Sequence, residues 1–347
     1  MRPKRKTNPN IVIICEGTET EESYFSDLKE YITQNVDTIY SDIRIVPTKK
    51  EMIINTKPQG RRQRQFVTGD KSNYRYYYQT EEKEEDYNQY KAQPTRYVRE
   101  AQLFIKNDGF SEAWAVFDND KFPCRKEAFD LADSCPNLWI AYSSISFEEW
   151  LLLHFNRDSN KYECSECKCD KGKSLGCDSN KGCKGNRCIA GRLRAESYIQ
   201  NYSKSQSVFY HILDRLEQAR INAAWIRHQN AMPIYEANPF TNVDELVNKL
   251  LGYDSKYVWI TLGDKFEFDG TILQLTRSGD TYLLHNIGKK SVIINHTNLR
   301  STDLEGASQE IISGIIEPNE CAEWDLNSIP YNFLRFSTKN RIVLLNR

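Results

Sequence analysis

Hydrophobic residues in the first 150 positions alternate between short unbroken runs and helical spacings. Residues 11–15 form an uninterrupted apolar run closed by Gly17, which is typical of a strand buried on both faces of a parallel sheet. Residues 18–34 then place apolar side chains at helical intervals. Further strands are expected at 43–46, 113–117 and 138–142, and further helices at 98–105 and 124–133. This alternation predicts an α/β fold with a doubly wound, mostly parallel sheet.

The periodicity changes from helical to strand-like near Gly252. Residues 208–229 and 241–251 have the spacing of amphipathic helices. Beyond them lie short alternating runs at 271–276, 281–285, 291–295 and 341–345, separated by Gly, Asn and Asp. We therefore expect a separate C-terminal all-β domain, sandwich-like, over residues 255–347.

Two polar segments interrupt the α/β pattern. Residues 50–92 are rich in tyrosine and arginine and then in glutamate, and residues 161–190 contain six cysteines among Lys, Gly and Ser. We interpret both as insertions into one α/β domain over residues 8–252, whose last part, 191–252, is helical.

The composition limits the class of protein without indicating a partner. The chain of 347 residues is 39% hydrophobic and 27% charged, with a net charge of −1, which is typical of a soluble protein. The first apolar run is too short for a signal peptide and no run is long enough to span a membrane, so we expect a cytoplasmic protein. Its ten cysteines are then expected to be reduced, and their clustering favours metal binding over disulfides.

Carboxylates directly follow two of the predicted strands. Glu16 follows 11–15, and Asp118 and Asp120 follow 113–117. Because the carboxyl ends of parallel strands meet at one sheet edge, we expect these three side chains to converge. Converging carboxylates repel one another unless a hard divalent cation neutralises them, and oxygen ligands favour Mg²⁺ or Mn²⁺. Taken alone, the Asp-x-Asp pair fits a solvated turn equally well.

Four motifs together resemble a known family, the RloB-like Toprim proteins, across most of residues 10–252. They are Glu16-Gly17-Thr18-Glu19-Thr20-Glu21 followed by Tyr24-Phe25, then Phe117-Asp118-Asn119-Asp120, then Phe147-Glu148-Glu149-Trp150-Leu151-Leu152-Leu153-His154-Phe155, and last Asn238-Pro239-Phe240-Thr241 with Leu246-Val247. The resemblance implies a Toprim fold, a metal-dependent nuclease that cleaves RNA, tRNA included, or DNA, and a role in bacterial defence against phage, often beside an ATPase partner. The C-terminal β domain lies outside it.

The residue types suggest a division of roles in such an enzyme. Asp118 and Asp120 would hold the metal ion, and Glu16 would either ligate the same ion or act as a general acid or base. Glu148 begins a predicted helix, where a negative charge is already favoured by the helix dipole. Because the resemblance places this helix beside the acidic site, Glu148 is also a candidate second metal ligand, or a partner of the ligands.

The cysteine-rich segment predicts a zinc site. Its six cysteines lie among almost no apolar residues, and they are Cys164, Cys167, Cys169, Cys177, Cys183 and Cys188. Four thiolates around Zn²⁺ would supply the folding energy that a core cannot, and six allow a two-zinc cluster. Lys184 and Arg187 make the segment basic, which suits phosphate contact, although a purely structural staple explains the cysteines equally well.

The tyrosine-rich insertion is a second candidate nucleic-acid contact. Arg61, Arg62, Arg64 and Arg75 are interleaved with aromatic residues, as in proteins that bind single strands. The alternative is that these cations pair with the acidic run at 81–86 of the same insertion.

Three functions therefore compete at the level of sequence. The first is a metal-dependent nuclease. The second is a non-catalytic, zinc-containing module that binds nucleic acid or protein within a defence complex. The third, primase-like nucleotide transfer, would share the metal site but needs a template-binding domain that we do not identify in the sequence. Nucleic acid is the expected partner, and self-association is left open.

Overall fold

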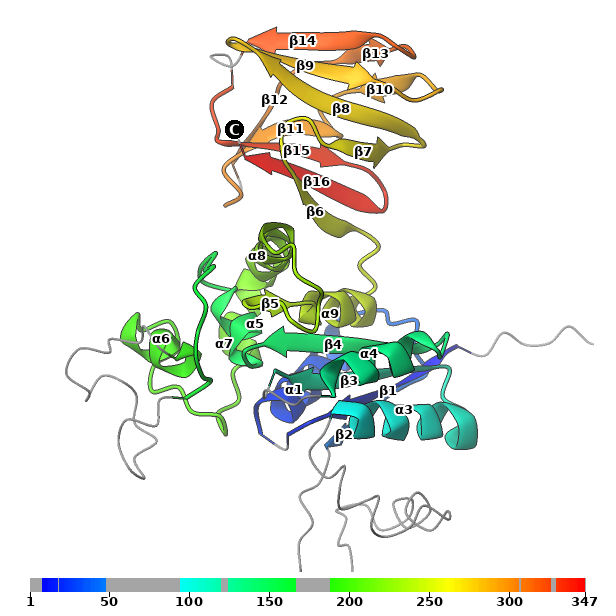
Figure 1. Ribbon diagram of the computed structural model, residues 1–347, viewed down its shortest axis with the longest axis vertical. Coiled ribbons are helices and arrows are strands. Elements are labelled where there is room, and N and C mark those ends of the chain that lie inside the picture. The colour runs from blue at the N-terminus through cyan, green and yellow to red at the C-terminus, as the bar shows by residue number, and fades with distance from the viewer. Residues whose placement is uncertain are drawn as a thin grey trace, which may run out of the picture. The chain divides into compact units, whose positions relative to one another are not determined.

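The computed structural model describes residues 8–17, 19–47, 94–119, 124–166, 188–305, 307–325 and 329–346. It is a mixed α/β structure with a strand-rich C-terminal region (Figure 1). The chain forms two compact units. The first comprises residues 1–152, 160–214 and 232–246, and the second comprises residues 153–159, 215–231 and 247–347.

The first unit is built on a five-stranded sheet in the order β2-β1-β3-β4-β5. Its strands are β1 (Asn10–Cys15), β2 (Asp42–Pro47), β3 (Glu112–Asp118), β4 (Leu138–Ser144) and β5 (Phe240–Thr241). The first four are parallel, and the short β5 is antiparallel to β4. The predicted parallel sheet is therefore present, and each of its four parallel strands lies within two residues of its expected bounds, whereas the short β5 was not predicted.

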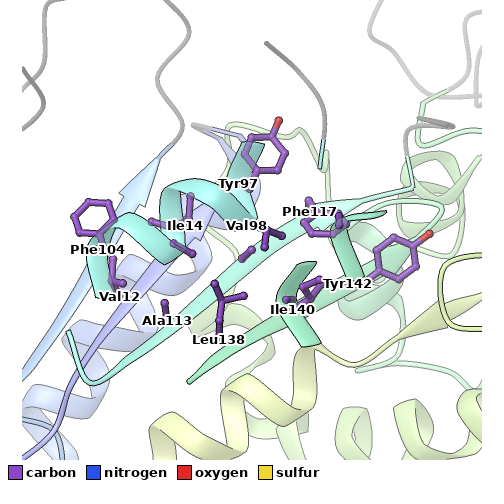
Figure 2. Packing of buried hydrophobic residues seen from close by; sticks show 14 of the residues in the cluster. Val12, Ile14, Tyr97, Val98, Phe104, Ala113, Phe117, Leu138, Ile140 and Tyr142 are labelled. Carbon is purple, nitrogen blue, oxygen red and sulfur yellow. The ribbon is translucent and has the colours of Figure 1, made fainter. Parts of the chain in front are cut away.

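Helices α3 (Pro94–Asp108) and α4 (Arg125–Asp133) cover one face of this sheet. Val12 and Ile14 of β1 share one apolar cluster with Val98 and Phe104 of α3 and with inward-facing residues of β3 and β4 (Figure 2). Successive strand residues point to opposite faces, so Ile13 and Cys15 face the other side. The acidic first turn of α1 (Thr20–Asn35) acts electrostatically on Cys15, which places α1 on that second face.

An aromatic cluster fixes α1 to the loop before α5 (Glu148–Leu152) and to α7 (Phe209–Ile212). The ring of Tyr24 lies edge-on to Phe25, Phe147 and Phe209, with centroid separations of 5.3, 5.4 and 5.4 Å. Each such pair contributes about 0.5–1.5 kcal/mol beyond its burial. The cluster thereby holds the start of α5 beside the start of α1.

Asn242, directly after β5, extends the pairing along β4 with its side chain as well as its backbone. Its Oδ1 accepts from the Tyr142 backbone N–H at 2.7 Å, and its Nδ2 donates to the Ile140 carbonyl at 2.9 Å. The amide thus pairs as a strand residue would. Helix α9 (Val243–Leu251) begins directly after it, two residues later than the sequence predicted.

The helix expected at 208–229 is divided into three pieces. They are α7, a 3₁₀ turn at Leu213–Arg215 and α8 (Leu216–Gln229). Phe209 in α7 packs against Tyr31, whereas Ile221 in α8 packs with Trp259 in the second unit's own cluster. The tightened turn lets the two parts bury different faces, which a single amphipathic pattern does not reveal.

The strand-rich region forms two main sheets, in the orders β12-β11-β15-β16-β6 and β14-β9-β8-β7, with β10 paired to β13. Its strands are β6 (Lys256–Ile260), β7 (Lys265–Phe268), β8 (Thr271–Ser278), β9 (Thr281–Asn286), β10 (Val292–Ile294), β11 (Leu299–Thr302), β12 (Ser308–Glu310), β13 (Gly314–Ile316), β14 (Cys321–Asp325), β15 (Phe333–Ser337) and β16 (Arg341–Asn346). Asp269 and Gly270 join β7 to β8 with φ of 46° and 79°, the positive values that a two-residue hairpin turn requires.

Side chains from both main sheets share one apolar core. The rings of Phe266 and Phe268 on β7 lie 5.0 and 6.2 Å from Phe336 on β15, centroid to centroid. The buried Asn286 is hydrogen-bonded on both sides of its amide: Oδ1 accepts from the Thr271 hydroxyl at 2.9 Å, and Nδ2 donates to the Ile316 carbonyl. The core is therefore held by apolar packing and by neutral hydrogen bonds.

Candidate functional site

Glu16 and Asp118 meet at the carboxyl end of two neighbouring parallel strands, as the sequence predicted. The Glu16 backbone N–H donates to the Val116 carbonyl at 2.9 Å, which extends the pairing of β1 with β3 by one residue. The Asp118 backbone N–H then donates to Glu16 Oε2 at 3.0 Å. The half-buried Glu16 side chain is thereby held over the end of β3.

Asp118 carries its carboxyl group into a buried, negatively charged environment. The residue is 8% exposed. Burial raises the pKa of Asp118 well above its ordinary value, and the negative charges of Glu21, Glu16 and Glu148 raise it further, against the opposing effect of Lys204. A cation bound at this edge of the sheet would relieve that repulsion.

Glu148 lies at the start of α5 and is 1% exposed. Its Oε1 accepts from the Tyr202 hydroxyl at 2.8 Å, and its Oε2 accepts from the Ser165 hydroxyl at 3.3 Å. The Lys204 ammonium lies 3.9 Å from Oε1. The sequence left open whether Glu148 only interacts favourably with the helix dipole or also belongs to the acidic site. In the structure its negative charge acts on Asp118 and raises the pKa of that residue.

Glu21 and Lys204 belong to this cluster although the sequence reasoning assigned them no role. Glu21 is 8% exposed, and a Cβ at Gly17 would come 2.9 Å from Glu21 Oε2, so the glycine allows this close approach. The signal for Glu21 was its place in the Glu16-to-Glu21 motif. Lys204 lies in a polar stretch without periodicity, so only the folded chain identifies it.

The loop that carries Tyr202 and Lys204 is fixed from two sides. The Thr20 hydroxyl donates to the Lys204 carbonyl at 3.0 Å. Arg194 Nη1 donates to the Tyr202 carbonyl at 2.8 Å. Both contacts anchor backbone, so the side chains of this loop are presented to the acidic cluster in a defined position.

Asn119 ties the end of β3 to β4. Its backbone N–H donates to the Ser143 carbonyl at 3.0 Å, and its side-chain amide donates to the Ser144 hydroxyl at 2.9 Å. Asp120, the next residue, lies outside the described residues. Its predicted convergence with Glu16 and Asp118 therefore stays a prediction.

The two outermost cysteines of the predicted zinc segment lie side by side. Cys164 and Cys188 form an isolated parallel bridge, and the Ala190 N–H donates to the Ser165 carbonyl at 3.1 Å. The Gly191 N–H donates to Cys188 Sγ at 3.3 Å, so this thiol caps α6 (Ile189–Ala195). Cys167, Cys169, Cys177 and Cys183 lie outside the described residues, and so do the candidate nucleic-acid contacts Arg61, Arg62, Arg64, Arg75, Lys184 and Arg187.

The donor chemistry of the acidic cluster fits a hard divalent cation. Its side chains offer carboxylate oxygens, the ligands that Mg²⁺ and Mn²⁺ prefer. Within the described part of the chain, no three His, Cys, Asp or Glu side chains are already arranged to hold a metal ion. The predicted three-carboxylate set includes Asp120, so it is not tested by this arrangement.

No curated protein and no solved structure matches the chain. Across the ranges that the structure describes, no helix combines the length and the apolar character that crossing a membrane requires. Residues 11–250 match a protein family described as RloB-like protein, which is more than half of the chain. The chain therefore belongs to the RloB-like protein family.

Proposed function

We propose that this chain is a Mg²⁺- or Mn²⁺-dependent nuclease with a Toprim-type core, acting on RNA or DNA in defence against phage. The observation that carries this proposal is the meeting of Glu16 with the buried Asp118 at the ends of two parallel strands. Four parallel strands with helices packed on them support the fold assignment, and membership of the RloB-like family supports the functional one.

The residues of the cluster would divide the work. Asp118 and Glu16, together with Asp120, would hold the divalent cation, which when bound neutralises phosphate charge and activates water for attack. Asp118 keeps a fixed position because its own backbone N–H is bonded to Glu16. Glu16 is half-buried, so it is accessible enough to exchange a proton with the reacting groups.

We further propose that the cysteine-rich segment binds zinc, and that its basic residues and those of 50–92 contact the nucleic acid. The backbone bridge between Cys164 and Cys188 supports the zinc site, because it brings the first and last cysteines of the segment side by side. The hydrogen bond between Ser165 and Glu148 joins the base of this segment to the acidic cluster.

The test is cleavage by the purified full-length protein, with Mg²⁺ or Mn²⁺, of tRNA, single-stranded DNA and duplex DNA. Asp118→Asn and Glu16→Gln should each lower the rate by roughly 10²–10⁴-fold, because they remove charge at nearly constant size. Glu112→Gln, at the opposite end of β3, is the matched control and should retain the wild-type rate.

Two outcomes would contradict the nuclease. Wild-type rates in both site variants would exclude these carboxylates from catalysis. Nucleic-acid binding without cleavage of any substrate, together with phage protection that survives Asp118→Asn in cells, would favour the non-catalytic binding module.

A further inference from the structure

Both oxygens of Glu148 are already engaged by the protein. Tyr202 donates to Oε1 and Ser165 to Oε2, and the side chain is 1% exposed. A carboxylate that binds a metal ion must direct a lone pair at the ion, and a nearby ammonium group disfavours a second cation there. Glu148 is therefore better suited to anchor Lys204 than to ligate a metal ion.

Lys204 brings a positive charge into the acidic cluster. Its ammonium lies 3.9 Å from Glu148 Oε1 and interacts electrostatically with Asp118, Glu21 and Glu166 as well. Partial burial lowers the pKa of Lys204, but these carboxylates raise it more, so the net pKa lies above the ordinary value and the group stays charged. The side chain is still 36% exposed, so an incoming oxygen atom can reach it.

The backbone from which the Lys204 side chain extends is held at two carbonyl groups. Thr20 holds the Lys204 carbonyl, and Arg194 holds the carbonyl of Tyr202 two residues earlier. Tyr202 itself is bonded to Glu148. A charge held in place in advance stabilises a developing charge without the cost of reorganisation at the moment of reaction.

We propose that the acidic cluster takes a single divalent cation, at Glu16 and Asp118, and that Lys204 supplies the second positive charge by contacting a non-bridging phosphate oxygen of the substrate. This inference rests on the proposed nuclease function. In two-metal sites a second ion performs the corresponding task of clamping the phosphate. In this protein the Lys204 ammonium group, anchored by Glu148, would replace that second ion.

The first experiment is calorimetric titration of the full-length protein with Mn²⁺ alone. The wild type should bind one more ion than Asp118→Asn. Lys204→Met should bind that ion about tenfold more tightly, because a nearby positive charge has been removed. A lysine with a merely structural role would give unchanged or weaker binding when replaced.

The second experiment is cleavage at saturating Mn²⁺. Lys204→Met should be slower by about a hundredfold or more, whereas Lys204→Arg, which keeps the charge, should recover part of the rate and bind Mn²⁺ within about threefold of the wild type. Lys126→Met is the control: Lys126 pairs with Asp130 on the surface of α4, and its loss should change neither measurement. Thermal melting verifies folding, and Lys204→Gln repeats the comparison with a polar head group.

The outcomes separate this inference from the proposed function. Two outcomes would overturn the single-ion site with its lysine. One is the loss of two Mn²⁺ ions in Asp118→Asn. The other is unchanged or weaker Mn²⁺ binding in both Lys204→Met and Lys204→Gln. A wild type that neither binds Mn²⁺ nor cleaves would instead refute the nuclease itself. If the wild type binds and cleaves, the Lys204 variants decide the inference alone.

Discussion

The first unit and the strand-rich C-terminal region bury polar groups of different kinds. Buried residues of the first unit include the ionisable side chains Glu21, Glu100, Asp118, Glu148, Glu149 and Asp244. From β6 onward, the buried polar residues of the described chain are neutral: Thr271, Asn286, Ser301 and Thr302. Burying a charge costs free energy unless it is compensated, so stability alone would not retain the first arrangement. The contrast supports placing the proposed metal site in the first unit.

Removal of zinc should give the largest difference in stability between the first unit and the second. Structural zinc contributes about 10–16 kcal/mol of apparent binding free energy. Wild-type protein should contain at least one zinc ion per chain, and Cys164→Ser with Cys188→Ser should lose it, loosening the first unit while the second still unfolds at its original denaturant concentration. Elemental analysis and denaturant titration measure both effects.

The exposed Cys321 on β14 provides the control for the zinc variant. Cys321→Ser should change neither zinc content nor stability, because the thiol lies outside the cysteine-rich segment. A folded wild type that contains no zinc would refute the zinc site.

Trp259→Ala tests the contribution of apolar packing to the stability of the second unit. Trp259 is 4% exposed, its indole N–H donates to the Ile221 carbonyl at 3.0 Å, and its ring contacts Phe333. Truncation should cost about 3–5 kcal/mol in the second unit. Mn²⁺ affinity, measured by titration, should be unchanged; a weakened affinity would mean that the metal site depends on this packing.

Glu100 tests whether every buried charge in the first unit serves the site. Burial raises its pKa from 4.5 to about 7, against the effect of Arg96, and it lies on α3 rather than in the acidic cluster. The pKa of Glu100 is higher in the folded than in the unfolded protein, so ionisation of this carboxyl group costs folding free energy. This cost is absent below about pH 4.5, grows between pH 4.5 and pH 7, and is complete above pH 7.

Glu100→Gln should therefore stabilise the protein by about 2–4 kcal/mol at pH 8 and by almost nothing at pH 4. Urea unfolding at the two pH values measures this gain. The exposed Glu127 on α4 is the control, and Glu127→Gln should stay within about 0.5 kcal/mol at either pH. A loss of stability at pH 8 would show that the Glu100 charge has a compensating partner.

The smallest effect is expected on the ribbon formed by β10 and β13. Ile293 and Ile315 lie directly opposite each other and are 62% and 63% exposed. Ile293→Thr should change the free energy of unfolding by less than about 1 kcal/mol. Its buried neighbour Ile294 is 1% exposed, and Ile294→Ala should cost about 2–4 kcal/mol. If Ile293→Thr destabilised the protein as much as Ile294→Ala, the face of the ribbon that carries Ile293 and Ile315 would have to be covered in solution.

Sequence patterns predicted the parts of this structure that depend on local periodicity. The unbroken run 11–15 predicted a buried parallel strand, and its position relative to 113–117 placed Glu16 beside Asp118. Lys204 and Tyr202 were missed because they lie in a loop whose sequence has no repeating pattern. Their contacts to Glu148 and Thr20 join segments far apart in the chain, and composition carries no signal for such pairs.

The way Asn242 completes β4 has a consequence for synthesis of the protein. The strand residue Tyr142 and its partner Asn242 are 100 positions apart. At roughly 5–20 residues per second, a ribosome needs about 5–20 s to make the chain between them. During that interval the nascent sheet has an open edge, and open edges pair readily with other strands. The sheet therefore stays open along Tyr142 until the chain through Asn242 has been synthesised.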